Sequence, residues 1–388
     1  MEERRSYVTE EFKKLYGRLP SIWARAPGRV DLMGSHTDYN MGFVMTMTID
    51  RDTWIAAYPR EDDQVAIHSC NVPDGAIFSL DDIQRDEAVA WTNYVRGVAA
   101  MMKDSGYKLC GFDGLVHSTI PFGSGLSSSA AIEMASALLF KTLCNLTLDP
   151  VDMALIGQKA ENDFVGVRTG ILDQYSSVMG QGGCAILLDC RDLTSDVVRI
   201  SPNLHIVICN TKAERNLVGS EYDERRAQCE EGVRLLQRFY PGITALRDVT
   251  LEMFARKRKA LPELIARRCQ FIIEENQRVL DLEQVLPEGH REPLSALFAA
   301  SYSGARDLYE IGAPAMDAMM HAILTAPGVV AARQAGAGFG GSMVALVKDG
   351  FLEPFTVHAI ETYRQETKLE PEVYAVEATP GAEILDWD

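Results

Sequence analysis

A run of glycines and serines at residues 121–131, PFGSGLSSSAA, has the composition of an anion-binding loop. It lies between a segment with strand character and a segment with helical periodicity. Glycine lets the backbone approach an anion closely, serine adds hydroxyl donors, and the first turn of a helix supplies free N–H groups with a partial positive charge. Serine is also a common residue at helix starts. The segment therefore predicts either a phosphate cradle or a serine-capped turn.

Two better-known phosphate motifs are excluded. No Lys follows the glycines of residues 121–131, so the loop is not a Walker A motif. Residues 336–341, GAGFGG, satisfy G-x-G-x-x-G, but residues 342–347, SMVALV, have strand character where a dinucleotide-binding fold needs a helix. Residues 336–341 are instead interpreted as a turn that brings the backbone close to a neighbouring loop or a ligand.

Two carboxylates have settings that suit phosphoryl transfer. Glu161 lies late in a segment with helical periodicity, and Asp173 follows Gly170 at an expected helix start. Each taken alone is typical of a solvated carboxylate or a helix-start residue. Together with a phosphate loop, however, a serine–carboxylate pair can hold a hard cation and a separate acid can serve the acceptor.

The first half of the chain is expected to position these residues with a mixture of strands and helices. Alternating, β-branched and aromatic residues predict strands, whereas apolar residues at helical spacing predict helices. In the helix expected over residues 151–165, Leu155 and Ile156 are expected to point inward. The expected strands are residues 22–26, 41–58, 114–120 and 184–189, and the expected helices are residues 130–143 and 151–165.

After residue 193 long charged amphipathic segments predict a more helical half. We therefore expect two domains, residues 1–194 and 195–388, that pack against each other and leave a cleft. The expected helices here are residues 221–239, 262–279 and 293–308, and the expected strands are residues 204–209, 342–347 and 373–377.

The composition limits the kinds of binding partner and the cellular compartment that we expect for this chain. The chain has 388 residues and a net charge of -17, which disfavours nonspecific binding to nucleic acids and to acidic membranes. Its eight cysteines form no C-x-x-C pair or metal-binding spacing, a usage typical of reduced thiols in a cytosol. No apolar run is long enough for a secretion signal or a membrane span. We expect a cytoplasmic protein whose partners are small molecules.

Five segments resemble one family of enzymes. Residues 25–40, RAPGRVDLMGSHTDYN, match its first signature, residues 121–131 its second and residues 336–342 its third. Residues 170–174 and 219–226 match two further segments. The chain resembles the GHMP small-molecule kinases and, within them, the galactokinases. The resemblance implies an α+β fold of two domains: an N-terminal domain like ribosomal protein S5 domain 2 and a ferredoxin-like C-terminal domain.

The resemblance also implies the reaction and the residues. The reaction would be ATP-dependent phosphorylation of the anomeric hydroxyl of galactose to galactose 1-phosphate, by a monomer or weak oligomer. Asp173 would face that hydroxyl beside Arg29, either removing its proton or chiefly orienting it. Ser129 and Glu161 would hold Mg²⁺. The sugar would be bound by Ser35, His36, Asp38, Gly170 and Tyr222. The ATP phosphates would be bound by Gly123, Ser124, Gly125, Leu126, Ser127, Ser128 and Ser129, backed by Gly338, Gly340 and Gly341.

One position departs from the galactokinase pattern and leaves the sugar open. Ser35 stands where galactokinases have Glu, which contacts the hydroxyl on C6. Ser35 could reach that hydroxyl through a water molecule. It would equally suit arabinose, which lacks C6, or galacturonate, because Glu beside a uronate would cost ~1 to 4 kcal/mol at about 4 Å. L-arabinokinase and galacturonokinase therefore stay as alternatives to galactokinase.

A non-catalytic function is available on the same fold. Galactose sensors of this kind lose activity through a two-residue gap in the serine run, and residues 127–131 of this chain are intact. We therefore expect an enzyme and keep the sensor as the weaker alternative. Kinases of the same family that act on mevalonate or homoserine conflict with the sugar-type residues His36, Asp38 and Tyr222.

Overall fold

The computed structural model describes residues 1–213 and 218–387, with the side chains of residues 218–220 outside that description. Within these ranges an eight-stranded sheet has the order β12-β1-β2-β5-β3-β4, with β6 paired to β2 and β7 paired to β6. Its strands are β1 (Ile22–Met33), β2 (Phe43–Pro59), β3 (Gln64–Ser69), β4 (Ala76–Ser79), β5 (Phe112–Ser118), β6 (Cys184–Asp189), β7 (Thr194–Arg199) and β12 (Glu383–Ile384).

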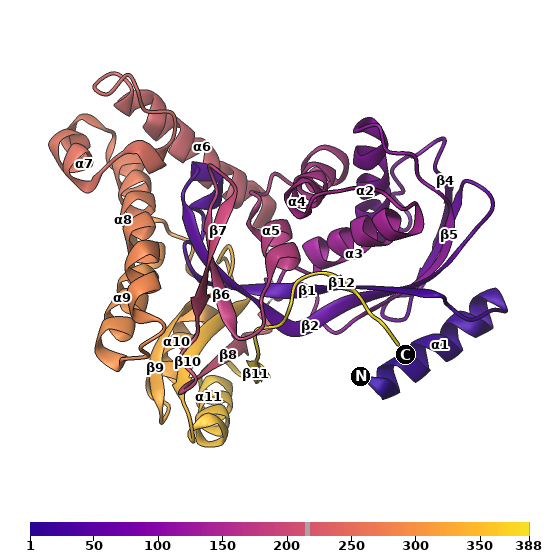
Figure 1. Cartoon of the computed structure of the whole chain (residues 1–388). Coiled ribbons are helices and arrows are strands. Elements are labelled where there is room, and N and C mark those ends of the chain that lie inside the picture. Colours follow the sequence, from indigo (N-terminus) through magenta and orange to yellow (C-terminus); the bar gives the residue numbers. More distant parts are fainter. Residues whose placement is uncertain (214–217, 388) are drawn as a thin grey trace.

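Helices cover this sheet on both faces. Side chains of a strand alternate between faces, so Ala24 and Ile55 pack against α2, α3 and α4, whereas Trp23 and Trp54 pack against α1 on the opposite face. In Figure 1, α2 to α5 gather above the long β1–β2 pair and α1 lies below it. The helices are α1 (Glu2–Tyr16), α2 (Asn93–Asp104), α3 (Ser128–Leu143), α4 (Pro150–Lys159) and α5 (Leu172–Met179).

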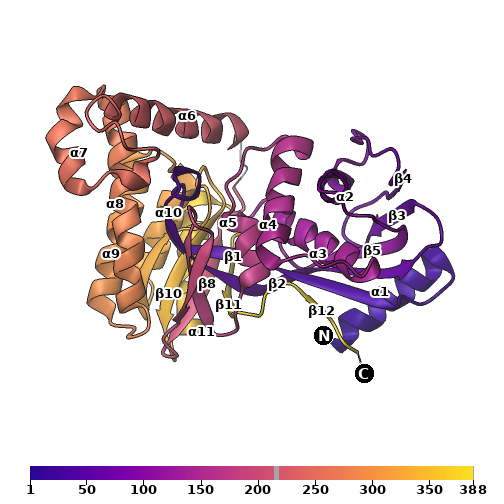
Figure 2. The ribbon, with the colours of Figure 1, turned by 45° about the horizontal axis from the view of Figure 1, so that its top comes forward.

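A second, antiparallel sheet has the order β11-β8-β10-β9 and lies between two helix layers. Ile206 and Val344 pack toward α8 and α9, whereas Val207 and Ala345 pack toward α10 and α11. Figure 2 shows these helices on either side of the sheet. The strands are β8 (Leu204–Asn210), β9 (Val329–Gln334), β10 (Ser342–Lys348) and β11 (Glu372–Val376), and the helices are α6 (Val218–Leu236), α7 (Leu251–Lys257), α8 (Glu263–Val285), α9 (Arg291–Ser303), α10 (Pro314–Leu324) and α11 (Leu352–Thr367).

The two sheets share one apolar core. Val30 and Met47, near one end of the β1–β2 pair, belong to the same cluster of buried side chains as Ile206 and Val344 of the second sheet. The pair therefore reaches from the layer of α3 to the layer of α8. This continuity fixes the position of the residues that follow β1 relative to the turn at residues 336–341.

Most elements expected from the sequence are confirmed, with three differences. The helix expected over residues 293–308 is divided into α9 and a π-helical turn, Gly304–Leu308. Leu155 was expected to point inward, but it is 37% exposed on the outer side of α4, so that prediction is wrong. The helix expected over residues 151–165 is divided into α4 and a π-helical turn, Ala160–Val165, which carries Glu161. β7 and β12 both pair within the first sheet. The division of the chain into domains of residues 1–194 and 195–388 stays a prediction. All eight cysteines are free thiols.

Candidate active site

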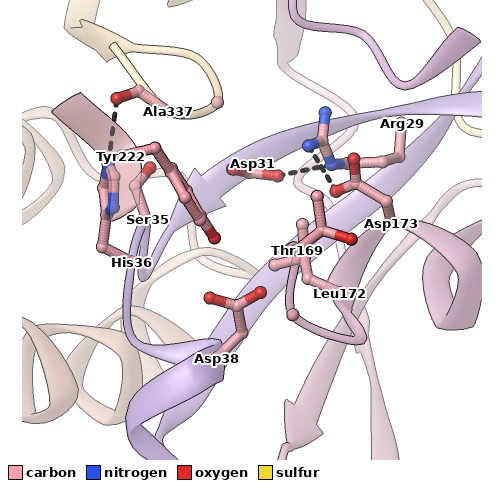
Figure 3. Close-up of a pocket in the computed structure, with 12 residues that line it drawn as sticks. Arg29, Asp31, Ser35, His36, Asp38, Thr169, Leu172, Asp173, Tyr222 and Ala337 are labelled. Carbon is pink, nitrogen blue, oxygen red and sulfur yellow. Dashed lines mark hydrogen bonds and ion pairs between the residues drawn. The ribbon is translucent and has the colours of Figure 1, made fainter. Parts of the chain in front are cut away.

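A cavity of about 100 Å³ lies where β1, α5, α6 and the turn after β9 meet. In Figure 3, Arg29 and Asp173 lie on one side of it and Ser35 and His36 on the other, with the ring of Tyr222 between them. The cavity brings together all seven residues predicted for the catalytic pair and the sugar site. Its lining is Arg29, Asp31, Ser35, His36, Asp38, Thr169, Gly170, Leu172, Asp173, Tyr222, Gly336 and Ala337.

Arg29 connects the acid of this cavity to the glycine–serine loop. It lies on β1 and is buried. Its Nη2 is 2.5 Å from Oδ1 of Asp173, and its Nε forms a 2.8 Å ion pair with Asp31. Nη1 donates to the backbone carbonyl of Gly125 over 2.8 Å. One guanidinium group therefore touches both the acid predicted to face the sugar and the loop predicted to hold phosphates.

Asp38 faces the cavity against the backbone of Gly170. A Cβ atom on residue 170 would overlap Oδ2 and Cγ of Asp38, so only glycine leaves this carboxylate its place. Burial raises the pKa of Asp38 to about 7, and the charges of Asp173 and Asp31 add to the shift. The group is therefore poised between its two protonation states near neutral pH.

The ring of His36 lines the cavity, and both of its nitrogens are hydrogen-bonded to other groups of the protein. Nε2 lies 2.9 Å from the carbonyl oxygen of Ala337, and Nδ1 lies 2.8 Å from the hydroxyl of Tyr39. Burial lowers the pKa of His36 to about 4. These partners assign a neutral imidazole with its proton on Nε2. The ring centroid lies 5.3 Å from that of Tyr222, so His36 shapes the pocket and ties the end of β1 to the turn after β9.

Ser35 is backed by a buried cation that the sequence did not reveal. Arg333 of β9 is fully buried, and its Nη2 lies 3.0 Å from Oγ of Ser35 and 3.2 Å from Oε1 of Glu275. Arginine only donates hydrogen bonds, so Ser35 Oγ accepts this one. Within the described residues the hydroxyl proton of Ser35 has no acceptor of its own, which leaves it available to a ligand in the cavity. Arg333 lies 298 positions from Ser35, and no motif joins the two.

The glycine–serine loop is not a serine-capped turn. Ser127 occupies the N-cap position of α3 with a left-handed backbone, φ 62°, and its side chain makes no capping hydrogen bond. Its buried Oγ has no partner among the residues that the structure describes. A buried hydroxyl without a partner is costly, so a ligand at the helix start accounts for it better than a cap does.

The turn at residues 336–341 supports this loop, as its composition predicted. Gly336 approaches so closely that a Cβ there would lie 3.1 Å from the carbonyl oxygen of Gly125. Oγ of Ser342 donates to the carbonyl oxygen of Ser124 over 2.8 Å. Gly338, by contrast, packs against the backbone of Ile311. The contacts that support the loop thus come from Gly336, at the start of the turn, and from Ser342, directly after it.

Ser129 and Glu161 form a pair that fits a hard cation. The Ser129 hydroxyl lies close enough to Glu161 to influence its carboxylate, and Oε2 of Glu161 accepts a hydrogen bond from Thr169 Oγ1 over 2.7 Å. Burial raises the pKa of Glu161, and the charge of Asp173 adds to the shift. Mg²⁺ prefers oxygen ligands and is commonly held by one or two carboxylates plus substrate phosphates. No group of three or more acidic, His or Cys side chains able to hold a metal occurs among the described residues, so this small set suits a cation that arrives with phosphates.

A second cavity, of about 300 Å³, opens beside the start of α3. It was not predicted, because its apolar lining is drawn from segments spread between residues 53 and 132. Trp91 is part of the lining, and its Nε1 is buried without a partner in the described part of the chain. The lining consists of Thr53, Ser69, Asn71, Val72, Trp91, Tyr94, Val116, Ser118, Phe122, Ser128, Ser129 and Ile132. Ser128 and Ser129 connect this cavity to the glycine–serine loop.

The chain is similar to known proteins of one family. A galactokinase galactose-binding signature matches residues 10–59, and a GHMP kinase N-terminal domain matches residues 93–181. The galactokinase of Roseiflexus sp. strain RS-1 is 40% identical over 374 residues, which cover 96% of this chain and 95% of the relative. The chain belongs to the galactokinase family.

Further relatives agree with this assignment. The galactokinase of Chloroflexus aurantiacus is 41% identical over 375 residues, covering 96% of this chain and 95% of that protein. The crystal structure of Lactococcus lactis galactokinase complexed with galactose has a TM-score of 0.94 and 32% identity, covering 98% and 99% of the two chains. A mevalonate kinase at 16% identity, with a TM-score of 0.63 over 93% and 100% of the chains, shares the fold.

The family and the α+β GHMP kinase fold expected from the five sequence segments are thus confirmed. The chain is a member of a family of sugar kinases. Among the residues that the structure describes, no helix combines the length and the apolar character needed to cross a membrane.

Proposed function

We propose that the protein transfers the γ-phosphoryl group of ATP to the anomeric hydroxyl of galactose and gives galactose 1-phosphate. The observation that carries this proposal is the position of Arg29, which touches both Asp173 in the small cavity and the carbonyl of Gly125 in the glycine–serine loop. A sugar hydroxyl at Asp173 and a phosphate on the loop would therefore meet at one guanidinium group. The names of the relatives supply the substrate.

In the proposed reaction Asp173 accepts the proton of the anomeric hydroxyl as that oxygen bonds to the γ-phosphorus. The bond between the γ-phosphorus and the bridging oxygen breaks, and ADP leaves. Arg29 keeps Asp173 placed and offsets negative charge on the transferred group. Mg²⁺ held by Ser129 and Glu161 would neutralise charge on the phosphates. Acid–base help of the kind assigned to Asp173 is worth roughly 10² to 10⁴ in rate.

The two cavities divide the substrates between them. The apolar cavity beside α3 would take the adenine base, with the ring of Trp91 in its wall and the loop from Gly123 to Ser129 around the phosphates. The small polar cavity would take the sugar, with Asp38 and Tyr222 facing its hydroxyl groups. Gly338, Gly340 and Gly341 would complete the turn that backs the loop.

The surroundings of Ser35 favour a second candidate substrate. Its hydroxyl faces the cavity with the buried Arg333 cation behind it. Such a site can donate to the C6 hydroxyl of galactose, but it also suits the C6 carboxylate of galacturonate. Arabinose would leave this donor without a partner, so the structure favours it less.

A coupled assay of ADP release with ATP, Mg²⁺ and each of the three sugars tests the proposal. We expect the highest kcat/KM with galactose, and the phosphate on the C1 oxygen when the product is examined by ³¹P NMR. Binding of galactose and ATP without turnover would contradict the proposal and support a sensor. A higher kcat/KM for galacturonate would replace the substrate and leave the chemistry in place.

The variant Ser35→Glu isolates the role of residue 35. It should lower activity on galacturonate relative to galactose, because Glu adds a negative charge close to the sugar carboxylate. The ratio of the two kcat/KM values measures the effect. An unchanged ratio would mean that residue 35 does not read the C6 group.

We also propose that the protein works in the cytoplasm as a monomer or weak oligomer. Eight free cysteines are consistent with a reducing compartment. Sedimentation of the purified protein tests the oligomeric state, and a stable dimer would contradict it.

A further inference from the structure

A carboxyl group buried behind the proposed reaction site has no part in the chemistry described above. Glu133 lies on α3 four residues after Ser129, so the two side chains lie one helical turn apart on the same face. Its side chain is fully buried. Burying a carboxyl group is unfavourable unless hydrogen bonds compensate, so its hydrogen-bond partner bears on its role.

That partner is the amide group of Gln174. Nε2 of Gln174 lies 2.8 Å from Oε2 of Glu133 and 2.9 Å from Oε2 of Glu161. A side-chain amide carries two N–H donors, so one side chain holds both carboxyl groups. Gln174 is itself fully buried and directly follows Asp173 in the first turn of α5. The hydrogen bonds from Gln174 to Glu133 and to Glu161 therefore join α3, α5 and the π-helical turn.

The hydrogen bonds converge on one oxygen of Glu161. Its Oε2 accepts from Gln174 and from Thr169 Oγ1, at 2.9 and 2.7 Å. Two donors from different segments fix the plane of the carboxylate relative to Ser129. Groups that orient a metal ligand in this way commonly change metal affinity 10- to 100-fold when they are removed.

We propose that Glu133 is a positioning residue that acts through Gln174 to hold Glu161 in the orientation that binds a divalent cation beside Ser129. Glu133 supplies the acceptor that fixes the amide, and the amide fixes the carboxylate. The inference rests on the proposed function, because it takes Ser129 and Glu161 as the cation-holding pair.

Two variants of nearly equal volume separate the acceptor from the packing. Glu133→Gln keeps an oxygen that can accept from Gln174, whereas Glu133→Met fills the space without an acceptor. Ser136→Ala is the matched control, since Ser136 is a buried polar residue of the same helix whose hydroxyl, among the described residues, bonds the carbonyl of Ile132 alone. Electron paramagnetic resonance of free Mn²⁺, titrated with enzyme and ADP, measures cation binding without turnover.

We expect Glu133→Met to weaken Mn²⁺ binding about 10- to 100-fold, with Glu133→Gln and Ser136→Ala close to the unchanged protein. The dissociation constant of galactose, measured by calorimetry without nucleotide, should stay the same in all three. A folded Glu133→Met protein with unchanged Mn²⁺ affinity would overturn the proposal, as would a Glu133→Gln variant as weak as Glu133→Met.

A second variant covers a failure of Glu133→Met to fold. Gln174→Met removes both donors of the bridge and should weaken Mn²⁺ binding by a similar factor, and unchanged affinity there would also overturn the proposal. If the unchanged protein binds no Mn²⁺ with ADP, the cation site of the proposed function fails instead. The two failures are therefore distinguishable.

Discussion

In the small cavity proposed to bind the sugar, charged side chains from several segments hold one another in place, whereas the glycine–serine loop and the neighbouring apolar cavity contain buried polar atoms without partners among the described residues. Arg29 is engaged by Asp173, Asp31 and Gly125 before any substrate binds. Ser127 Oγ and Trp91 Nε1, by contrast, are buried with neither a hydrogen bond nor an ion pair among the described residues. On the proposed function, the sugar side is pre-organised, and the nucleotide side would gain its hydrogen bonds when the nucleotide binds.

This difference predicts where substitutions will act. Residues of the small cavity should affect the rate or the choice of sugar strongly, because several of them hold one another through hydrogen bonds or ion pairs that a substitution would break. Residues of the proposed nucleotide site should affect the KM for ATP more mildly, because backbone groups of the loop would supply most of the contacts to the phosphates.

The largest expected effect is that of Asp173→Asn. The amide keeps the shape of the side chain but cannot accept the sugar proton, so kcat should fall by roughly 10² to 10⁴. Calorimetric binding of galactose and of ATP should change little. Asp104→Asn, at the exposed end of α2, is the control. A kcat within about threefold of the unchanged enzyme would remove Asp173 from the chemistry.

The next effect is that of Gly170→Ala. The added Cβ would displace the Asp38 carboxylate, and a hydrogen bond to a charged group is worth about 1.5 to 3 kcal/mol. We expect kcat/KM for galactose to fall about 10- to 100-fold with little change in the KM for ATP. Gly242→Ala is the matched control, because a Cβ there meets no atom within 4 Å. Equal kinetics of the two variants would refute the role assigned to this close approach.

A pH series tests the charge state of Asp38. Burial raises its pKa to about 7, so the free enzyme holds a proton there below pH 7 and loses it above. If the carboxylate accepts sugar hydroxyls, galactose affinity should rise about tenfold from pH 6 to pH 8 and then level off. His36, with a pKa of about 4, stays neutral over this range. Asp38→Asn should bind more weakly and without the pH dependence, and a flat profile for the unchanged enzyme would contradict the assignment.

The smallest effect should come from the apolar cavity. Trp91→Leu removes a ring worth about 0.5 to 1.5 kcal/mol of aromatic contact, so the KM for ATP should rise about 2- to 12-fold with kcat for galactose nearly unchanged. Phe239→Leu, at an exposed ring outside both cavities, serves as control. A fall in kcat of the size expected for Asp173→Asn would mean that the two regions are not built differently.

The two regions also differ in how much of them could be predicted from the sequence. Arg29, His36, Asp38 and Asp173 lie in compact segments whose residue types and order identify them, and the structure places their side chains around one cavity. The turn at residues 336–341 was predicted to be followed by a strand, and β10 confirms it.

The rest depends on contacts between distant segments. Arg333 meets Ser35, and Glu133 meets Gln174, only because β9 and α5 are packed against β1 and α3, and no local spacing encodes such pairs. The apolar cavity beside α3 is lined by ordinary apolar and small polar residues from distant segments, and no local motif marks them as a site. Leu155 shows the related error, because four successive apolar residues, 153–156, do not reveal which side of the helix faces solvent.

A crystal structure with galactose and a non-hydrolysable ATP analogue tests the central claim most directly. The account predicts the anomeric oxygen within hydrogen-bonding distance of Asp173, in line with the terminal phosphorus, and a phosphate oxygen beside Arg29. A sugar bound with a different hydroxyl at Asp173, or a terminal phosphate remote from Arg29, would contradict it.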